Sequence, residues 1–417
     1  MIKNLVSSLF KSGSSQNITA VWDKFHPHLR PQDSFKQRDS ADVYTVFANV
    51  RFGKDTWVEL MEIEYRKKDD QFWISDAAYG KALEGDPEIG RLKVEAVDAR
   101  LWYATPTIIN IEPTTRCNFN CWYCVGRHMK QADIRVEDFE AMLDNFSGLK
   151  TIALVGEGEP LMHKDFFAMA RMAKARGIRV MIISNGSAFS ASVIKQLCEE
   201  EIAYVAISID SADPQTFASS RLDGDLEKVW RGIRKLREYR DAHGYVYPKI
   251  SLKGTLFSDT KTELPSIVDA AISNGVEVFE SFQPLNPMKN YVRIYPKAKL
   301  KELDVIDDVV ASAHSDYAYA TSKLEPFREF CDKEGIDLFP RTKANPKFKN
   351  CDETWIYSLL TGDVTPCCQV KNPPSERWNI FEKKIGDILD DADYENLRFN
   401  LWNGIFPDYC EGCWKTR

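Results

Sequence analysis

The most informative absences in this 417-residue chain are a long apolar run and an excess of positive charge. No apolar stretch approaches the roughly 20 residues that a membrane helix needs, so we expect no membrane partner. Lysine and arginine total 55 against 62 aspartates and glutamates, which gives a formal net charge of −7. This balance is unfavourable for extended contact with phosphate backbones and argues against a nucleic-acid partner.

The amino terminus also lacks a secretory pattern. Residues 1–10 have one lysine and a short apolar stretch without a small-residue cleavage site, so we expect a helix there. The chain nevertheless has 10 cysteines. In a chain without a secretory signal, cysteines indicate metal binding rather than disulfides, and we expect a cytoplasmic location. Seven of them form two groups with ligand-like spacing, namely Cys117, Cys121 and Cys124, and Cys351, Cys367, Cys410 and Cys413.

We interpret residues 1–100 as a separate domain. Three runs rich in β-branched and aromatic residues predict a small β-meander, at residues 43–51, 56–66 and 71–75. These residues contain no functional motif that we identify. A cap over an active site and a substrate-recognition domain are equally compatible with this pattern.

From residue 107 onward, strand-like and helical patterns alternate. Six β-type runs are expected at residues 107–112, 151–155, 179–184, 204–210, 249–256 and 277–282. Amphipathic helical patterns lie between them, and two more follow in residues 297–334. Because parallel strands need helical crossovers, this order predicts a parallel sheet with helices outside. In barrel-like folds of this kind the functional site lies at the carboxyl ends of the strands.

Three cysteines follow the first of these strands on one short loop. Cys117, Cys121 and Cys124 have the spacing C-x3-C-x2-C. Three thiolates can ligate three corners of a cubane iron–sulfur cluster, which leaves one iron open for chemistry. A structural zinc site with a distant fourth ligand and three unrelated buried cysteines are the alternatives.

This loop, with the aromatic Tyr123 before its last cysteine, resembles the signature of the radical S-adenosylmethionine (radical SAM) superfamily. The resemblance covers about residues 107–285. It implies an α/β fold with a partial (β/α)6 barrel at residues 101–340, and a [4Fe–4S] cluster whose open iron chelates SAM. It also implies a reductant such as flavodoxin or ferredoxin and cleavage of SAM to a 5′-deoxyadenosyl radical that removes hydrogen from a C–H bond.

Further polar residues follow the later strands. The glycines of the run 156–160 allow close approach to a ligand, and its second carboxylate suits an ammonium group. The family's Gly-Gly-Glu-Pro motif, which holds the amino group of SAM, matches at Gly158, Glu159 and Pro160, whereas Glu157 replaces the first glycine. The resemblance further implies cofactor contacts at Ser184, Asn185 and Arg221, and at Ser208 and Asp210, whose hydroxyl and carboxylate suit a ribose diol. A generic turn or surface charge is the alternative at each position.

A second group of cysteines follows near the carboxyl end. Cys351, Gly362 and Cys367 match the start of the SPASM pattern, and Cys410 and Cys413 form a C-x2-C pair. Four thiols would enclose one auxiliary [4Fe–4S] cluster, and the end of the chain at Arg417 indicates the shortened "twitch" form at residues 341–417. A four-cysteine zinc ribbon has the same spacing and stays open.

The resemblance favours an oxidoreductase acting on a small polar metabolite, such as a sugar or aminocyclitol. A SPASM-type maturase acting on a peptide and a radical epimerase are the alternatives, and a non-catalytic zinc scaffold is a remote one. Lys253, which alternates with apolar neighbours on its strand, is expected to face the barrel interior as a substrate contact or as a buried, satisfied lysine. Cys331 and Cys368 are candidate hydrogen donors, because a thiol near the substrate could return a hydrogen atom.

Overall fold

The computed structural model describes residues 36–37, 43–52, 56–66, 71–74, 107–336, 356–389, 391–394, 397, 401 and 406–413. The chain divides into two compact units. The first comprises Met1–Thr105, Phe339–Thr354 and Gly386–Phe406, and the second comprises Pro106–Leu338, Trp355–Ile385 and Pro407–Arg417. No helix among the described residues is both long and apolar enough to cross a membrane.

The described part of the first unit is an antiparallel sheet of four strands in chain order. They are β1 (Lys36–Gln37), β2 (Val43–Phe52), β3 (Thr56–Arg66) and β4 (Gln71–Ile74). The predicted β-meander is therefore confirmed. The helix expected at residues 1–10 lies outside the described residues.

The second unit is built on a sheet of nine strands whose centre is parallel. Six strands lie side by side in chain order, as the alternating pattern predicts: β5 (Ile108–Ile111), β6 (Thr151–Leu154), β7 (Arg179–Ser184), β8 (Tyr204–Ser208), β9 (Lys249–Leu256) and β10 (Val278–Pro284). Because consecutive strands are parallel neighbours, their carboxyl ends share one rim of the sheet.

Strands from distant parts of the chain extend this sheet on both sides. β11 (Glu325–Pro326) pairs in parallel with β10, and β12 (Ile356–Ser358) pairs in parallel with β5. β12 continues into the antiparallel β13 (Val364–Thr365). The first residues described after position 336 thus join the barrel sheet directly. The division into three domains, 1–100, 101–340 and 341–417, stays a prediction.

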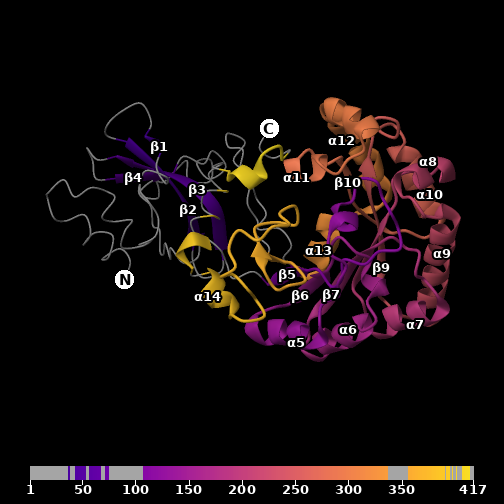
Figure 1. Ribbon diagram of the computed structural model, residues 1–417. Helices are drawn as coiled ribbons and strands as arrows, with labels where there is room; N and C mark the ends of the chain where they lie inside the picture. The colour runs from indigo at the N-terminus through magenta and orange to yellow at the C-terminus, as the bar shows by residue number, and fades with distance from the viewer. Residues whose placement is uncertain are drawn as a thin grey trace. The chain divides into compact units, whose positions relative to one another are not determined.

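Helices connect the parallel strands, and Figure 1 shows α5, α6, α7 and α9 along the outer face of the sheet. The first turns of α7 and α9 have local caps: Ser190 accepts from the amide of Val193, and Asp225 accepts from that of Lys228. The crossover helices are α5 (Val136–Asn145), α6 (Phe166–Ala175), α7 (Ala191–Glu199), α8 (Pro214–Ser220), α9 (Leu226–Ala242) and α10 (Leu264–Ser273). Sequence periodicity predicts all of these except α8, which has only seven residues.

Shorter elements and two helices complete the described chain. The 3-10 turns are η2 (Val125–His128), η3 (Pro160–Met162), η4 (Lys297–Val305) and η5 (Asp408–Cys410). The remaining helices are α11 (Lys289–Val292), α12 (Ile306–Lys323), α13 (Phe327–Glu334) and α14 (Ile385–Leu389).

Side chains inside the sheet change character from the amino ends of the strands toward the carboxyl ends. Ile108, Met181, Tyr204 and Phe330 belong to one buried apolar cluster near the amino ends. Alternate residues of a strand face the same side of the sheet. Glu112 is four positions after Ile108 and therefore lies on the same face. The apolar floor therefore gives way to polar groups at the rim where the cysteine loop begins.

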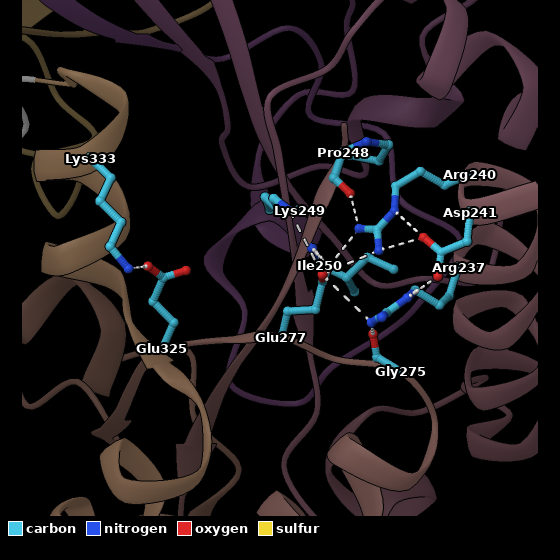
Figure 2. A network of polar contacts seen from close by, with 10 residues as sticks. All are labelled: Arg237, Arg240, Asp241, Pro248, Lys249, Ile250, Gly275, Glu277, Glu325 and Lys333. Carbon is cyan, nitrogen blue, oxygen red and sulfur yellow. Dashed lines mark hydrogen bonds and ion pairs between the residues drawn. The ribbon is translucent and has the colours of Figure 1, made fainter. Parts of the chain in front are cut away.

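A buried arginine fastens α9 to the amino ends of β9 and β10, opposite that rim (Figure 2). Arg240, with 4% of its side chain exposed, pairs with Glu277 (2.5 Å) and Asp241 (2.9 Å). It also donates to the carbonyl of Pro248 at 2.8 Å. Arg237, one turn earlier, is more exposed and bonds Asp241 and Gly275.

We expect Arg240→Ala to lower the free energy of unfolding by about 3 kcal/mol, because it removes the main partner of the half-buried carboxylate of Glu277. Arg237→Ala is the matched control, with an expected loss of about 1 kcal/mol or less for a more exposed ion pair. Urea unfolding of both variants measures the difference. Equal losses of unfolding free energy in the two variants would mean that the burial of Arg240 does not strengthen its ion pairs.

Candidate active site

The cysteine loop lies across the carboxyl ends of several strands. The backbone amide of Asn120 donates to the carbonyl of Leu222 (2.8 Å), and the backbone amide of Trp122 donates to the carbonyl of Ser220 (3.3 Å). Asn118 binds Ser187 after β7 through its side-chain amide (2.8 Å). The loop is therefore fastened to the segments that follow β7 and β8, where the sequence places the other candidate residues.

The segment after β6 packs directly on this loop. A Cβ added to Gly158 would lie 2.4 Å from the carbonyl oxygen of Thr114 and 2.6 Å from that of Arg116, so no side chain fits there. The amide of Glu159 donates to that same Arg116 oxygen at 2.8 Å. Pro160 then begins η3 and is buried. This close backbone approach gives the predicted Gly158–Glu159–Pro160 match a structural reason.

Glu159 is buried and accepts three hydrogen bonds. Its Oε1 accepts from the amide of Leu161 (3.2 Å) and from Ser184 Oγ (2.9 Å), and its Oε2 accepts from the amide of Asn185 (2.7 Å). Burial raises the pKa of Glu159 to about 7 despite these bonds. A carboxylate has about four acceptor positions, so one remains for an ammonium group.

Asn185 connects the same segment to the cysteine loop. Its Nδ2 donates to Asn118 Oδ1 at 2.9 Å and lies 3.7 Å from Cys117 Sγ. The structure therefore brings Ser184 and Asn185 to the cysteine loop, whereas their contact with a cofactor stays a prediction. Ser208, at the end of β8, is half-buried on the same face of that strand as the core residue Ala206.

Asp210 is a fully buried carboxylate at which four donors meet. They are Tyr123 Oη (2.7 Å), Ser220 Oγ (3.1 Å), Arg221 Nη2 (2.8 Å) and the amide of Thr255 (2.9 Å). These four bonds fill both oxygens, so Asp210 has no acceptor position left for the ribose diol that the sequence analysis assigned to it. In this structure Asp210 positions Tyr123 and Arg221.

Arg221 is buried beside the cysteine loop and has one donor to spare. Its Nη2 pairs with Asp210, whereas its Nε has no hydrogen-bond partner among the described residues. Its guanidinium lies 5.9 Å from the centre of the Tyr123 ring. Burial alone would lower its pKa, but Asp210, Tyr123 and Cys121 together outweigh burial and raise it, so the group stays cationic. An orphaned, buried donor of this kind fits a carboxylate ligand.

The three loop thiols lie in low-dielectric surroundings. Burial raises the pKa of Cys117 and Cys124, and that of Cys121 to about 11. Glu157 contributes further to the rise at Cys124, whose sulfur lies 3.4 Å from its Oε2. In the absence of iron these cysteines are therefore thiols, and metal ligation must offset the cost of forming thiolates.

Among the described residues, no three His, Cys, Asp or Glu side chains converge as the ligands of one metal ion would. The site fits a cluster with a bound amino acid moiety. Three thiols are available for iron, Glu159 has an open acceptor for an ammonium group, and Arg221 Nε is an orphaned donor for a carboxylate.

Lys253 faces the barrel interior, as predicted, but has a partner there. It forms an ion pair with Glu280 of β10, and Tyr204 Oη donates to the other oxygen of that carboxylate at 2.8 Å. This geometry corresponds to the buried, satisfied lysine, the second of the two readings that the sequence left open. A substrate contact by Lys253 stays a prediction.

The structure separates the two candidate hydrogen donors. Cys331 is 1% exposed and packs with Ile108 and Met181 in the apolar cluster near the amino ends of the strands. That position is at the opposite end of the barrel from the cysteine loop, so we withdraw Cys331 as a donor. Cys368 follows β13 and is partly exposed, and it contributes to the electrostatic surroundings of Lys253 and Tyr357.

The carboxyl-terminal cysteines approach one short loop after β10. Asn286 of this loop binds Gln369, two residues after Cys367. Gly412, between Cys410 and Cys413, has a positive φ of 85° and packs on the carbonyl of Pro287. Two segments some 40 positions apart in the sequence thus meet the same loop. Cys351 lies outside the described residues, so the complete four-cysteine set stays a prediction. No disulfide joins the described cysteines.

Sequence reasoning missed a buried polar group between β5, β6 and β12. It comprises Glu112, Glu157, Tyr357 and Lys371, and Lys371 Nζ lies within 3.0 Å of an oxygen of each of the other three. Glu112 directly follows a buried strand, which is a signal that sequence analysis could have used. Lys371 has no such signal, because only the fold brings it to this rim.

Comparison with known proteins agrees with this geometry. Residues 111–249 match the sequence model of the Radical SAM superfamily. A tungsten-containing aldehyde ferredoxin oxidoreductase cofactor-modifying protein of Pyrococcus furiosus is 25% identical, over 73% of this chain and 86% of its own. An AdoMet-dependent heme synthase of Methanosarcina barkeri is 28% identical, over 74% of this chain and 91% of its own.

A solved structure has a similar fold. Streptococcus suis SuiB bound to the precursor peptide SuiA superposes with a TM-score of 0.53 at 15% identity, covering 85% of this chain and 90% of that one. The matched residues 111–249 begin at the end of β5 and contain the cysteine loop and the rim segments after β6, β7 and β8. Residues 111–249, which carry the three-cysteine loop and the polar rim around it, are thus the part of this chain that matches the radical SAM superfamily.

Proposed function

We propose that this protein reductively cleaves S-adenosylmethionine and uses the product to remove hydrogen from a C–H bond of a small polar metabolite. The observation that carries the proposal is the convergence of the cysteine loop with Glu159 and Arg221 at one rim of the sheet. A [4Fe–4S] cluster held by Cys117, Cys121 and Cys124, when bound with SAM, supplies the electron and the 5′-deoxyadenosyl radical.

The residues of this chain have separate tasks in the proposal. Glu159 accepts a hydrogen bond from the SAM ammonium group at its remaining acceptor position, and Arg221 donates from Nε to the SAM carboxylate. Asp210 holds Arg221 and Tyr123 in place. Trp122 and Phe257 belong to a buried apolar cluster beside the loop, which limits the access of water to a reactive intermediate.

A second, auxiliary cluster is proposed on Cys351, Cys367, Cys410 and Cys413. Its support is the spacing of these residues and the shared packing of the segments 367–369 and 410–413 on the loop after β10. Such a cluster would accept the second electron when a substrate is oxidised. We therefore favour oxidation over epimerisation.

Two kinds of substrate are compatible with the comparisons. The names of the two sequence relatives refer to modification of a cofactor and synthesis of heme, which are small-molecule reactions. The structural neighbour was solved with a precursor peptide. We prefer the small molecule because the sequence relatives are the more similar. A peptide is the second candidate.

Anaerobic reconstitution with iron, sulfide, SAM and a reductant tests the proposal. We expect about eight irons per chain, the count of two cubane clusters, and formation of 5′-deoxyadenosine and methionine. In deuterium oxide an oxidised product should be lighter by two hydrogens and carry no solvent deuterium at carbon. Stoichiometric zinc without sulfide would contradict the proposal.

The same assay distinguishes the fate of the substrate. A product of unchanged composition with one solvent deuterium at carbon, lost in the Cys368→Ala variant, would indicate epimerisation instead. Thiol protons exchange rapidly with solvent, so a thiol donor must leave that label.

A further inference from the structure

A buried charge group joins the segment after β13 to the cysteine loop. Only 8% of the Lys371 side chain is exposed, and its Nζ lies 2.9 Å from Glu112 Oε1 and 2.9 Å from Glu157 Oε1. Lys371 also donates to Tyr357 Oη at 3.0 Å, and Tyr357 Oη donates to Glu112 at 2.6 Å. We call these four residues the Lys371 group. Burial alone would lower the pKa of Lys371, but Glu157, Tyr357 and Glu112 outweigh burial and raise it, so the lysine is charged.

The Lys371 group reaches one of the three loop cysteines directly. Glu157 Oε1 binds Lys371, and Glu157 Oε2 lies 3.4 Å from the sulfur of Cys124. The backbone oxygen of Glu157 lies 3.7 Å from the same sulfur. The Glu157 carboxylate is thus interposed between a buried ammonium and a candidate iron ligand.

The formal charges of the group do not cancel. Two carboxylates face one ammonium, and Glu112 Oε2 has no hydrogen-bond partner among the described residues. In a low-dielectric interior such fixed charges act over longer distances than they do in water. A buried ion pair is weak evidence for a stabilising role. We therefore look for an electrostatic effect of this pair on the cysteine ligand beside it.

We propose that Lys371 and Glu157 set the reduction potential of the iron–sulfur cluster on Cys117, Cys121 and Cys124, with opposite signs. The inference rests on the proposed function. One-electron reduction adds negative charge to the cluster. The ammonium of Lys371 stabilises the reduced form and raises the potential, whereas the carboxylate of Glu157 destabilises it and lowers the potential.

The test is a potentiometric titration with dithionite of the anaerobically reconstituted full chain, followed by electron paramagnetic resonance. The loop cluster is recognised as the signal that changes on addition of SAM. In Lys371→Met the equilibrium constant for reduction should fall about tenfold, which equals about 59 mV for one electron. In the isosteric Glu157→Gln it should rise by a similar factor. The double variant should return close to wild type.

Lys253→Met is the matched control. It also removes a lysine from a partly buried carboxylate, Glu280, but that pair has no contact with the loop cysteines among the described residues. Its potential should stay at the wild-type value. A general effect of losing a buried lysine would shift this control together with Lys371→Met, and that result would overturn the inference.

Shifts of the same sign in Lys371→Met and Glu157→Gln, or no shift in either, would also overturn it. Should Lys371→Met lose its cluster, Glu157→Gln decides alone, and a potential at or below wild type contradicts the inference. Failure of the proposed function has a different signature. In that case the wild-type chain itself would show no signal that responds to SAM, and the inference would fall with it.

Discussion

Reconstituted protein with Cys117, Cys121 and Cys124 all replaced by alanine is expected to form no detectable 5′-deoxyadenosine. It should still retain about four of its eight irons, because the second set of cysteines is untouched. The reason is that a cluster on the three-cysteine loop would have one iron without a protein ligand, and that this loop contacts the rim segments after β6 and β7. Iron analysis and chromatography of the products measure both quantities.

Cys198→Ala is the control for this triple variant. Cys198 is fully buried in α7 within the apolar core and has no place in either cysteine group. Its replacement should leave the iron content and the product unchanged. Continued formation of 5′-deoxyadenosine by the triple variant under reducing conditions would show that the roles of the two cysteine groups are assigned wrongly.

Asp210→Ala is expected to lower the free energy of unfolding by roughly 3–5 kcal/mol, because it leaves the buried guanidinium of Arg221 without its counter-charge. It also releases Tyr123, which stands between Cys121 and Cys124. We therefore expect loss of iron from the cysteine loop together with loss of stability. Denaturant unfolding and iron analysis of the same preparation measure the two effects.

Tyr123→Phe is the matched control, because it removes one of the four hydrogen bonds to Asp210 and keeps the ion pair with Arg221. Its cost should be about 1 kcal/mol, the usual net value of one hydrogen bond. If Asp210 instead binds the ribose of SAM, Asp210→Asn would weaken SAM binding without lowering stability. That result would contradict the positioning role and restore the assignment made from the sequence.

Most of the barrel could be predicted because its signals are local. Buried parallel strands are continuous apolar runs, and amphipathic helices between them have a clear period. β7 and β9 have the bounds that the runs predict. The short helix α8 has only seven residues, too few for its period to show, although Asp213 caps its first turn. β12, with three residues, joins β5 across more than 200 positions, and no local pattern specifies that pairing.

The sequence by itself determined the radical SAM resemblance, the three-cysteine loop and the order of the six parallel strands, because spacing and periodicity are properties of neighbouring residues. Only the tertiary structure decided what those residues touch. It filled both oxygens of Asp210, gave Lys253 a carboxylate partner and placed Cys331 in the apolar core. It also brought Lys371 to Glu157 from 214 positions away. Contacts of this kind depend on the closure of the sheet, which a one-dimensional pattern does not encode.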